Sequence, residues 1–351
     1  MSQPESISSM ESVHTTVLLH ESIDGLAIRP GDIYLDGTLG AGGHAELAAK
    51  VAVVQGGSIT IIGLDQDAGA LARTKIRLAP FEHTNAAKNG IAKLFLIQQN
   101  YRNLDQALDS IVKELGSVAG EAKANRIMLD LGLSSDQFET SGRGFSFQKN
   151  EPLLMTFKEN PDQQITPGGA TDLTARQIIN TWDEENIADI IYGYGEERYS
   201  RKIAKGIVEA RAIKPIETTF DLVEIIKNST PARYQHGNIH PATRTFQALR
   251  ITVNDEINAL KEGLEKGWER LAANTSGADE SKGRMAVISF HSIEDRIVKH
   301  FYKSKEWTET ADGKKQRAAN IITKKPITAS HQEISENPRS RSAKLRIIEK
   351  L

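Results

Sequence analysis

The chain has 351 residues, of which 39% are hydrophobic and 26% charged, a balance typical of a folded globular protein and too apolar for a disordered one. It contains no cysteine, which excludes disulfides and cysteine metal sites, and its polar opening MSQPESISSME and lack of a long apolar run predict a cytoplasmic protein without membrane contact. The formal net charge is -2, but residues 296–351 hold 14 Lys and Arg against 6 Asp and Glu, so this end could either bind phosphate or be a solvated surface.

Apolar, partly β-branched runs alternate with segments of helical period over the first 132 residues. Strands are expected in DIYLDGT (32–38), SITIIGLD (58–65), AKLFLIQQN (92–100) and RIMLDLG (126–132). Helices are expected between them, in GHAELAAKV (43–51), AGALARTKIRL (68–78) and LDQALDSIVKEL (104–115). This βαβ series predicts a parallel sheet with helices on its faces.

Near residue 139 the alternation stops, and the chain reads as helices to about residue 240. One long helix is expected over 240–272, followed by a strand at 284–290, a helix at 292–302 and two short strands at 320–326 and 343–349. The polar segments 274–283 and 305–317 are expected to be loops. We therefore expect one α/β domain formed by residues 1–138 and 241–351, split by an inserted helical domain for substrate recognition at 139–240.

The stretch YLDGTLGAGGHAELA (34–48) places small residues between the first strand and the first helix. Gly40, Gly42 and Ala45 formally meet the dinucleotide fingerprint G-x-G-x-x-G/A. A carboxylate at Asp36, however, would repel a diphosphate at the strand end. S-adenosylmethionine (AdoMet) carries an ammonium and a sulfonium but no phosphate, so Asp36, Thr38, Gly40 and Gly42 favour its methionine end over a tight turn with a surface aspartate.

Polar residues also follow the other expected strands. Asp65 can accept both ribose hydroxyls, a role common to both cofactors. Asn100 and Tyr101 can lie beside an adenine, or can serve as a helix cap and a core aromatic. Asp130 ends the fourth strand, and Ser134, Ser135 and Gln137 follow it. In a doubly wound sheet these strand ends converge beside the first loop.

Together with further motifs, these residues resemble the ribosomal RNA small-subunit methyltransferase H family, also called MraW, over nearly the whole chain. The motifs are HTTVLLHE (14–21), DGTLGAGGH (36–44), LDLGLSSDQ (129–137), RGFSF (143–147), YGEER (194–198), HPATRTFQALRITVNDE (240–256), VISFHSIEDRIVKHF (287–301) and NPRSRSAKLR (337–346). The resemblance implies a class I AdoMet-dependent methyltransferase, α/β and Rossmann-like with a mostly parallel sheet and an inserted helical domain.

The same resemblance implies methylation of the exocyclic N4 of a cytidine in the decoding region of small-subunit ribosomal RNA. The implied partner is that RNA in an assembled or late-assembling 30S particle, and a homodimer is left open. The implied cofactor contacts are Gly42, Gly43, His44, Asp65, Tyr101, Asp130 and Gln137. Tyr101 departs mildly from the family, which usually has phenylalanine there.

A larger departure follows RGFSF, where the family usually continues G-P-L-D-M-R-M-D. Here Leu154, Thr156 and Phe157 replace the aspartate, the arginine and the second methionine. Loss of an acid together with a base suggests that an ion pair or one local site has been replaced by apolar packing. No catalytic role is therefore assigned to this segment.

Groups that hydrogen-bond the protons of an exocyclic amine would help its lone pair to attack. Asp130, Ser134 and Ser135 lie in the expected loop, with a cofactor role favoured for Asp130, and His291 could contact the base or accept a proton or could be structural. Residues expected to bind substrate are Arg143, Phe145, Arg244, Phe246, Gln247, Arg250, Asn254, Arg339 and Arg341. In the alternative, Phe246 belongs to the core and the arginines to the surface. No metal is expected.

Three functions stay open at this point: an AdoMet-dependent RNA methyltransferase, a nicotinamide-dependent dehydrogenase, and an RNA-binding or ribosome-assembly protein without catalysis. Asp36 disfavours the dehydrogenase. The altered segment 154–157 keeps the inactive binding protein under consideration.

Overall fold

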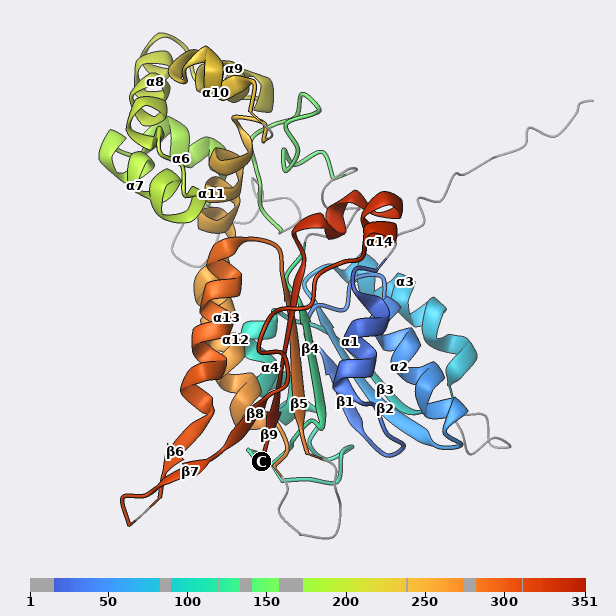
Figure 1. Cartoon of the computed structure of the whole chain (residues 1–351). Helices are drawn as coiled ribbons and strands as arrows, with labels where there is room; N and C mark the ends of the chain where they lie inside the picture. The colour runs from blue at the N-terminus through green and yellow to red at the C-terminus, as the bar shows by residue number, and fades with distance from the viewer. Residues whose placement is uncertain are drawn as a thin grey trace, which may run out of the picture.

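The computed structural model describes residues 16–82, 90–118, 120–132, 141–157, 173–237, 239–273, 282–310 and 312–351. Its centre is a seven-stranded sheet in the order β3-β2-β1-β4-β5-β9-β8 (Figure 1). The strands are β1 (Ile33–Asp36), β2 (Ser58–Asp65), β3 (Gly90–Gln98), β4 (Arg126–Asp130), β5 (Arg284–Ser289), β8 (Ala319–Ile321) and β9 (Lys344–Lys350). The neighbours from β3 to β5 are parallel, and β9 is antiparallel to both β5 and β8. The predicted α/β fold with a mostly parallel, Rossmann-like sheet is confirmed.

Helices cover both faces of this sheet. The described helices of this α/β domain are α1 (Leu19–Leu26), α2 (Gly43–Val54), α3 (Ala68–Leu78), η1 (Ala79–Phe81), η2 (Tyr101–Asn103), α4 (Leu104–Ser110), α12 (Glu256–Arg270), α13 (Ser292–Lys305), α14 (His331–Glu336) and η3 (Pro338–Ser342). Consecutive strand residues such as Tyr34 and Leu35 belong to different hydrophobic clusters. Tyr34 packs in the cluster with α1 and α2, and Leu35 in the cluster with α4, α12 and α13. The alternation follows from the two-residue period of a strand and buries both faces.

A separate helical unit stands beyond the carboxyl ends of the parallel strands (Figure 1). It comprises α6 (Ala175–Thr181), α7 (Glu184–Gly195), α8 (Ser200–Ile213), α9 (Thr219–Ser229), α10 (Ala232–Gln235) and α11 (Thr243–Asn254). Its hydrophobic cluster runs from Phe145 to Val253 and includes Phe246 and Leu249 of α11. Because residues of α11 pack in this cluster, the helical unit extends past the boundary expected at residue 240. We place its end at Asn254.

Two sequence predictions about secondary structure are wrong. The single helix expected over 240–272 is broken at Asp255, which has a left-handed backbone (φ 51°) and separates α11 from α12. The loop expected at 305–317 instead contains an antiparallel hairpin of β6 (Trp307–Glu309) and β7 (Lys315–Arg317). Both hairpin strands are exposed, so their sequence lacks the alternation of apolar and polar residues that predicts a strand. Among the described helices, none is long and apolar enough to cross a membrane.

Candidate functional site

Three aspartates lie at the carboxyl ends of neighbouring parallel strands. Asp36 ends β1, Asp65 ends β2 and Asp130 ends β4, and β1 pairs with both of the other strands. Because parallel strands present their carboxyl ends at one edge, these carboxylates share the edge that faces the helical unit. The convergence expected from the sequence is therefore present in the sheet order.

Thr38 ties the loop after β1 to the end of β4. Its backbone N donates to Oδ1 of Asp36 (3.1 Å), and its Oγ1 accepts from the backbone N of Asp130 (2.6 Å). The neighbouring N of Gly37 donates to the carbonyl of Met128 (2.9 Å). The position of Asp130 is thus fixed by the same loop that surrounds Asp36.

The glycine loop needs left-handed backbone at Gly40 (φ 52°) and Gly42 (φ 76°), which glycine adopts without a Cβ clash. A Cβ on Gly42 would meet the side chain of Thr74 at 2.6 Å, while Oγ1 of Thr74 donates to the carbonyl of Gly40 (2.9 Å). Thr74 therefore fills the room that Gly42 leaves. Helix α2 begins at Gly43 directly after this turn, and His44 is buried in its first turn.

The three carboxylates form a negative centre. Burial raises the pKa of Asp36 to about 7, although Thr38 and the Tyr34 hydroxyl (3.0 Å) hydrogen-bond its oxygens. Burial also raises the pKa of Asp130 to about 7, with repulsion from Asp36 contributing, and burial raises the pKa of Asp65. Among the residues that the structure describes, no Lys, Arg or His forms an ion pair with any of the three.

This charge pattern fits a cationic ligand and opposes a diphosphate. Ionised carboxylates are costly to bury without a counter-charge, so a positive group among Asp36, Asp65 and Asp130 would stabilise them. A pyrophosphate would instead add repulsion. The ammonium and sulfonium of AdoMet meet this requirement. The residues present therefore fit the methionine end of that cofactor.

Asp65 is held in place by backbone donors and keeps acceptor capacity. Its Oδ2 accepts from the N of Gly40 (2.8 Å) and its Oδ1 from the N of Asp67 (2.9 Å). Each carboxylate oxygen has a second lone pair, so both can still accept a hydroxyl proton. Asp65 could accordingly bind a ribose while it stabilises the glycine loop.

In the segment after β3, Asn100 caps a short helix and Tyr101 packs its ring against a neighbouring helix. Oδ1 of Asn100 accepts from the N of Arg102 (2.9 Å) and caps η2, which confirms the capping alternative for Asn100. The ring of Tyr101 packs on α12, where a Cβ on Gly263 would lie 2.5 Å from its Cδ2, and burial raises the pKa of its hydroxyl. Its expected contact with adenine stays a prediction, as do contacts of Ser134, Ser135 and Gln137, which lie outside the described residues.

His291 stands at the start of α13 and pairs with Glu294. The N of Glu294 donates to Nδ1 of His291 (3.4 Å), and Oε2 of Glu294 accepts from the N of Phe290 (2.8 Å) and of His291 (3.4 Å). This reciprocal arrangement is a capping box, with histidine in the N-cap position. Sequence reasoning missed Glu294, although the His-x-x-Glu spacing was a usable signal. The proton-accepting role expected for His291 is not tested by these contacts.

The RGFSF segment is anchored against the altered residues 154–157. Arg143 donates to the carbonyl of Phe157 (2.9 Å), and the rings of Phe145 and Phe157 stack with centroids 5.6 Å apart. Asn254 holds the same stretch, since its Nδ2 donates to the carbonyl of Met155 (2.7 Å) and its Oδ1 accepts from the N of Phe157 (2.8 Å). The segment is thus fixed by ring packing and by hydrogen bonds between its backbone and the side chains of Arg143 and Asn254.

The substrate residues expected on α11 have structural partners. Phe246 is buried in the helical unit, as the alternative interpretation had it, and Gln247 donates to the carbonyl of Tyr194 (2.8 Å). Arg250 forms a bidentate pair with Glu256 (2.8 and 2.7 Å), and Arg244 is half-buried. Phe246 therefore packs in the core, while RNA binding by the polar residues remains a prediction.

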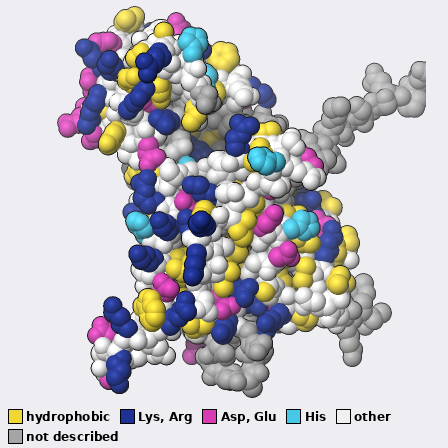
Figure 2. Space-filling model, in the orientation of Figure 1, with side chains coloured by type: hydrophobic (Ala, Val, Ile, Leu, Met, Phe, Trp, Pro, Cys, Tyr) yellow, Lys and Arg dark blue, Asp and Glu magenta, His cyan; other side chains and the backbone are white. Residues whose placement is uncertain are grey.

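Basic side chains gather over α13 and the neighbouring surface (Figure 2), including exposed Arg296, Lys299 and Lys303. Arg339 and Arg341 lie in η3, and Arg341 is exposed. Lys344, by contrast, lies 3.5 Å from the carboxylate of Asp295. This surface has the charge needed for phosphate contacts.

Comparison with known proteins gives matches over nearly the full length of the chain. The MraW methylase family model matches residues 11–351. "Ribosomal RNA small subunit methyltransferase H" of Heliobacterium mobile is 43% identical over 350 residues, covering 97% of this chain and 100% of the relative. Proteins of that name from Paenibacillus sp. (strain JDR-2) and Deinococcus deserti are 41% and 40% identical, covering 96% and 100% of this chain and 99% and 98% of the relatives.

Proposed function

Because the chain belongs to the MraW methylase family, we propose that it methylates the exocyclic N4 of a cytidine in the decoding region of small-subunit ribosomal RNA. It is an AdoMet-dependent ribosomal RNA methyltransferase, and the proposal concerns the target atom and its place in the RNA. Its full-length relatives carry the name of a small-subunit methyltransferase. The proposed partner is the assembled or late-assembling 30S particle, in the cytoplasm.

The observation that supports the cofactor side of the proposal is the carboxylate centre of Asp36, Asp65 and Asp130, while the RNA target is proposed from the names of the relatives. These aspartates lie at one sheet edge without a cationic side-chain partner among the described residues, and burial raises all three pKa values. We assign Asp65 to the ribose hydroxyls, and Asp36 and Asp130 to the positive methionine end. When bound, AdoMet supplies an electrophilic methyl group on a sulfonium. The same centre disfavours a nicotinamide dinucleotide.

The protein's task toward the acceptor is to orient a weakly nucleophilic amine. The N4 lone pair of cytosine is delocalised into the ring, so acceptors for the N4 protons favour its attack and stabilise positive charge on nitrogen. The backbone carbonyl of Asp130, whose carboxylate is assigned to the cofactor, and the hydroxyls of Ser134 and Ser135 supply such acceptors in this proposal. Arg143, Arg244, Arg250, Asn254 and Gln247 are proposed to hold the nucleotide and its phosphates.

The test is nucleoside mapping after methylation in vitro. Small subunits from cells that lack this gene are incubated with the protein and AdoMet, and the RNA is digested and analysed by mass spectrometry. We expect N4-methylcytidine in a decoding-region fragment. A methylated C5 or ribose, or a mark elsewhere, would contradict the proposed target, and no incorporation would favour the inactive binding protein.

A further inference from the structure

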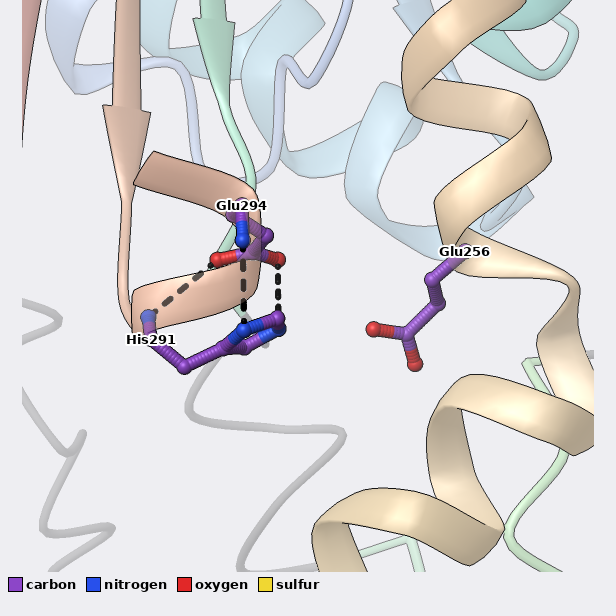
Figure 3. A group of neighbouring side chains, drawn as sticks. All are labelled: Glu256, His291 and Glu294. Carbon is purple, nitrogen blue, oxygen red and sulfur yellow. Dashed lines mark hydrogen bonds and ion pairs between the residues drawn. The ribbon is translucent and has the colours of Figure 1, made fainter. Parts of the chain in front are cut away.

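A second group of ionisable side chains lies where α12 and α13 begin. Glu256 is the first residue of α12, His291 caps α13 and Glu294 lies in the first turn of α13. One ligand atom from each lies within 4.8 Å of the others. Figure 3 shows the imidazole of His291 against the carboxylate of Glu294, with the carboxylate of Glu256 facing them from α12. Residues far apart in sequence thus present one nitrogen and two carboxylate groups to a common centre.

Nε2 of the imidazole is buried, and its described neighbour is the carboxylate of Glu294. The His291 side chain is only 8% exposed and Glu294 only 4%. Nδ1 is engaged by the backbone N of Glu294, whereas Nε2 lies 3.2 Å from Oε1 of Glu294 without forming a hydrogen bond to any described residue. Because Nδ1 accepts a hydrogen bond, Nε2 carries the ring proton, and a metal ion that binds Nε2 would displace this proton.

The charge of the group is also incomplete. Arg250 neutralises Glu256 through two hydrogen bonds, but no described Lys or Arg lies within ion-pair distance of Glu294. Burial raises the pKa of Glu256, and the nearby charge of Glu294 adds to that rise. Against the effect of burial, the hydrogen bond and charge of His291 lower the pKa of Glu294. Two buried carboxylates thus face one guanidinium and one imidazole. A cation at the common centre would balance them.

We propose that Glu256, His291 and Glu294 bind a divalent transition-metal ion, Zn²⁺ or Mn²⁺. One imidazole nitrogen and carboxylate oxygens are suitable ligands for such ions, at about 2.0–2.2 Å for zinc. Arg250 then acts as an outer partner that orients the Glu256 carboxylate, as hydrogen-bonded ligands commonly require. The ion joins α12 to α13 beside the helix break at Asp255, a structural role that goes beyond the proposed methyl transfer.

Metal binding is measured on the full chain without RNA or AdoMet, so that its outcome is independent of the methylation assay. The protein is treated with a chelator, dialysed and titrated with Zn²⁺ and with Mn²⁺ by calorimetry, and metal content is checked by mass spectrometry. His291→Asn removes the imidazole but keeps a good helix cap. His300→Ala is the matched control, an exposed histidine on the same helix.

We expect one ion per chain for the wild type and for His300→Ala, with at least tenfold weaker binding in His291→Asn and in Glu256→Gln. Melting curves establish that the variants are folded. Wild-type protein that takes up neither ion would overturn the proposal. Equally tight binding by folded His291→Asn would also overturn it.

Discussion

Oγ1 of Thr38 accepts a hydrogen bond of 2.6 Å from the backbone N of Asp130, across two neighbouring strands. Thr38 also donates its own N to Asp36, so one residue fixes both aspartates whose pKa values are raised to about 7. The cofactor side and the amine side of the proposed site are thereby parts of one rigid unit. Disturbing Thr38 should affect both.

Thr38→Val keeps the shape of the side chain but leaves the N of Asp130 without its acceptor. A buried donor without a partner costs about 1–3 kcal/mol of folding stability, and Asp130 loses the contact that holds it, so we expect a less stable protein that binds AdoMet more weakly. Thr38→Ser retains the hydroxyl and serves as the matched control. Calorimetric titration with AdoMet measures both. Unchanged affinity in folded Thr38→Val would show that the link has no part in binding.

Asp65→Ala should weaken AdoMet by about 1.5–3 kcal/mol, the range for a hydrogen bond to a charged group. The change also frees the N of Gly40 and of Asp67, which are its present donors. Asp65→Asn keeps one acceptor oxygen and should lose less AdoMet affinity than Asp65→Ala. If the alanine variant is folded and binds AdoMet as tightly as the wild type, the ribose assignment is wrong.

The basic end should contribute to RNA binding through phosphate contacts. Replacing Arg339 and Arg341 by glutamine should flatten the salt dependence of RNA binding, by about 0.7–0.9 in the logarithmic slope for each lost contact, and leave AdoMet affinity unchanged. Lys344→Gln should change the slope less, because Lys344 already lies beside Asp295. An unaltered slope in the double variant would identify these arginines as solvated surface.

Restoring the family's charged pair should not raise turnover. Leu154→Asp with Thr156→Arg would place one charge at the buried position 156 and another next to buried Met155, in a segment already held by Arg143 and Asn254. Methyl incorporation from labelled AdoMet into unmethylated small subunits compares the double variant with the wild type. Activity found in the variant alone would mean that this segment carries the chemistry.

Much of the fold could be predicted because local pattern and final packing agree. The apolar runs ending in Asp36, Asp65 and Asp130 are strands buried on both faces, and the parallel arrangement alone brings their ends together. The break at Asp255 could not be predicted, since the helical period continues through it and neither glycine nor proline marks it. A left-handed aspartate is tolerated there.

The residues of the candidate site also differ in whether they could be predicted from the sequence. Side chains placed by a single strand end, such as Asp65, were predictable from the sequence. The pairing of Arg250 with Glu256 depends on the turn at Asp255 between α11 and α12, and the approach of Glu256 to His291 depends on how α12 meets α13. A linear pattern specifies neither. Phe246 has the residue type for stacking on a base, and only its place in the helical core shows that it packs internally.

The central claim is that buried carboxylates bind a positively charged cofactor, and proton linkage tests it most directly. Asp36 and Asp130 have pKa values of about 7, and a cation favours their ionised forms, so bound AdoMet should lower both pKa values. AdoMet affinity should then rise as pH increases from about 6 to about 8, with protons released on binding. Calorimetric titrations at pH 7 in buffers of different ionisation enthalpy measure this release, and Asp36→Asn should reduce it. Proton uptake, or an affinity that falls as pH rises through 7, would contradict the account.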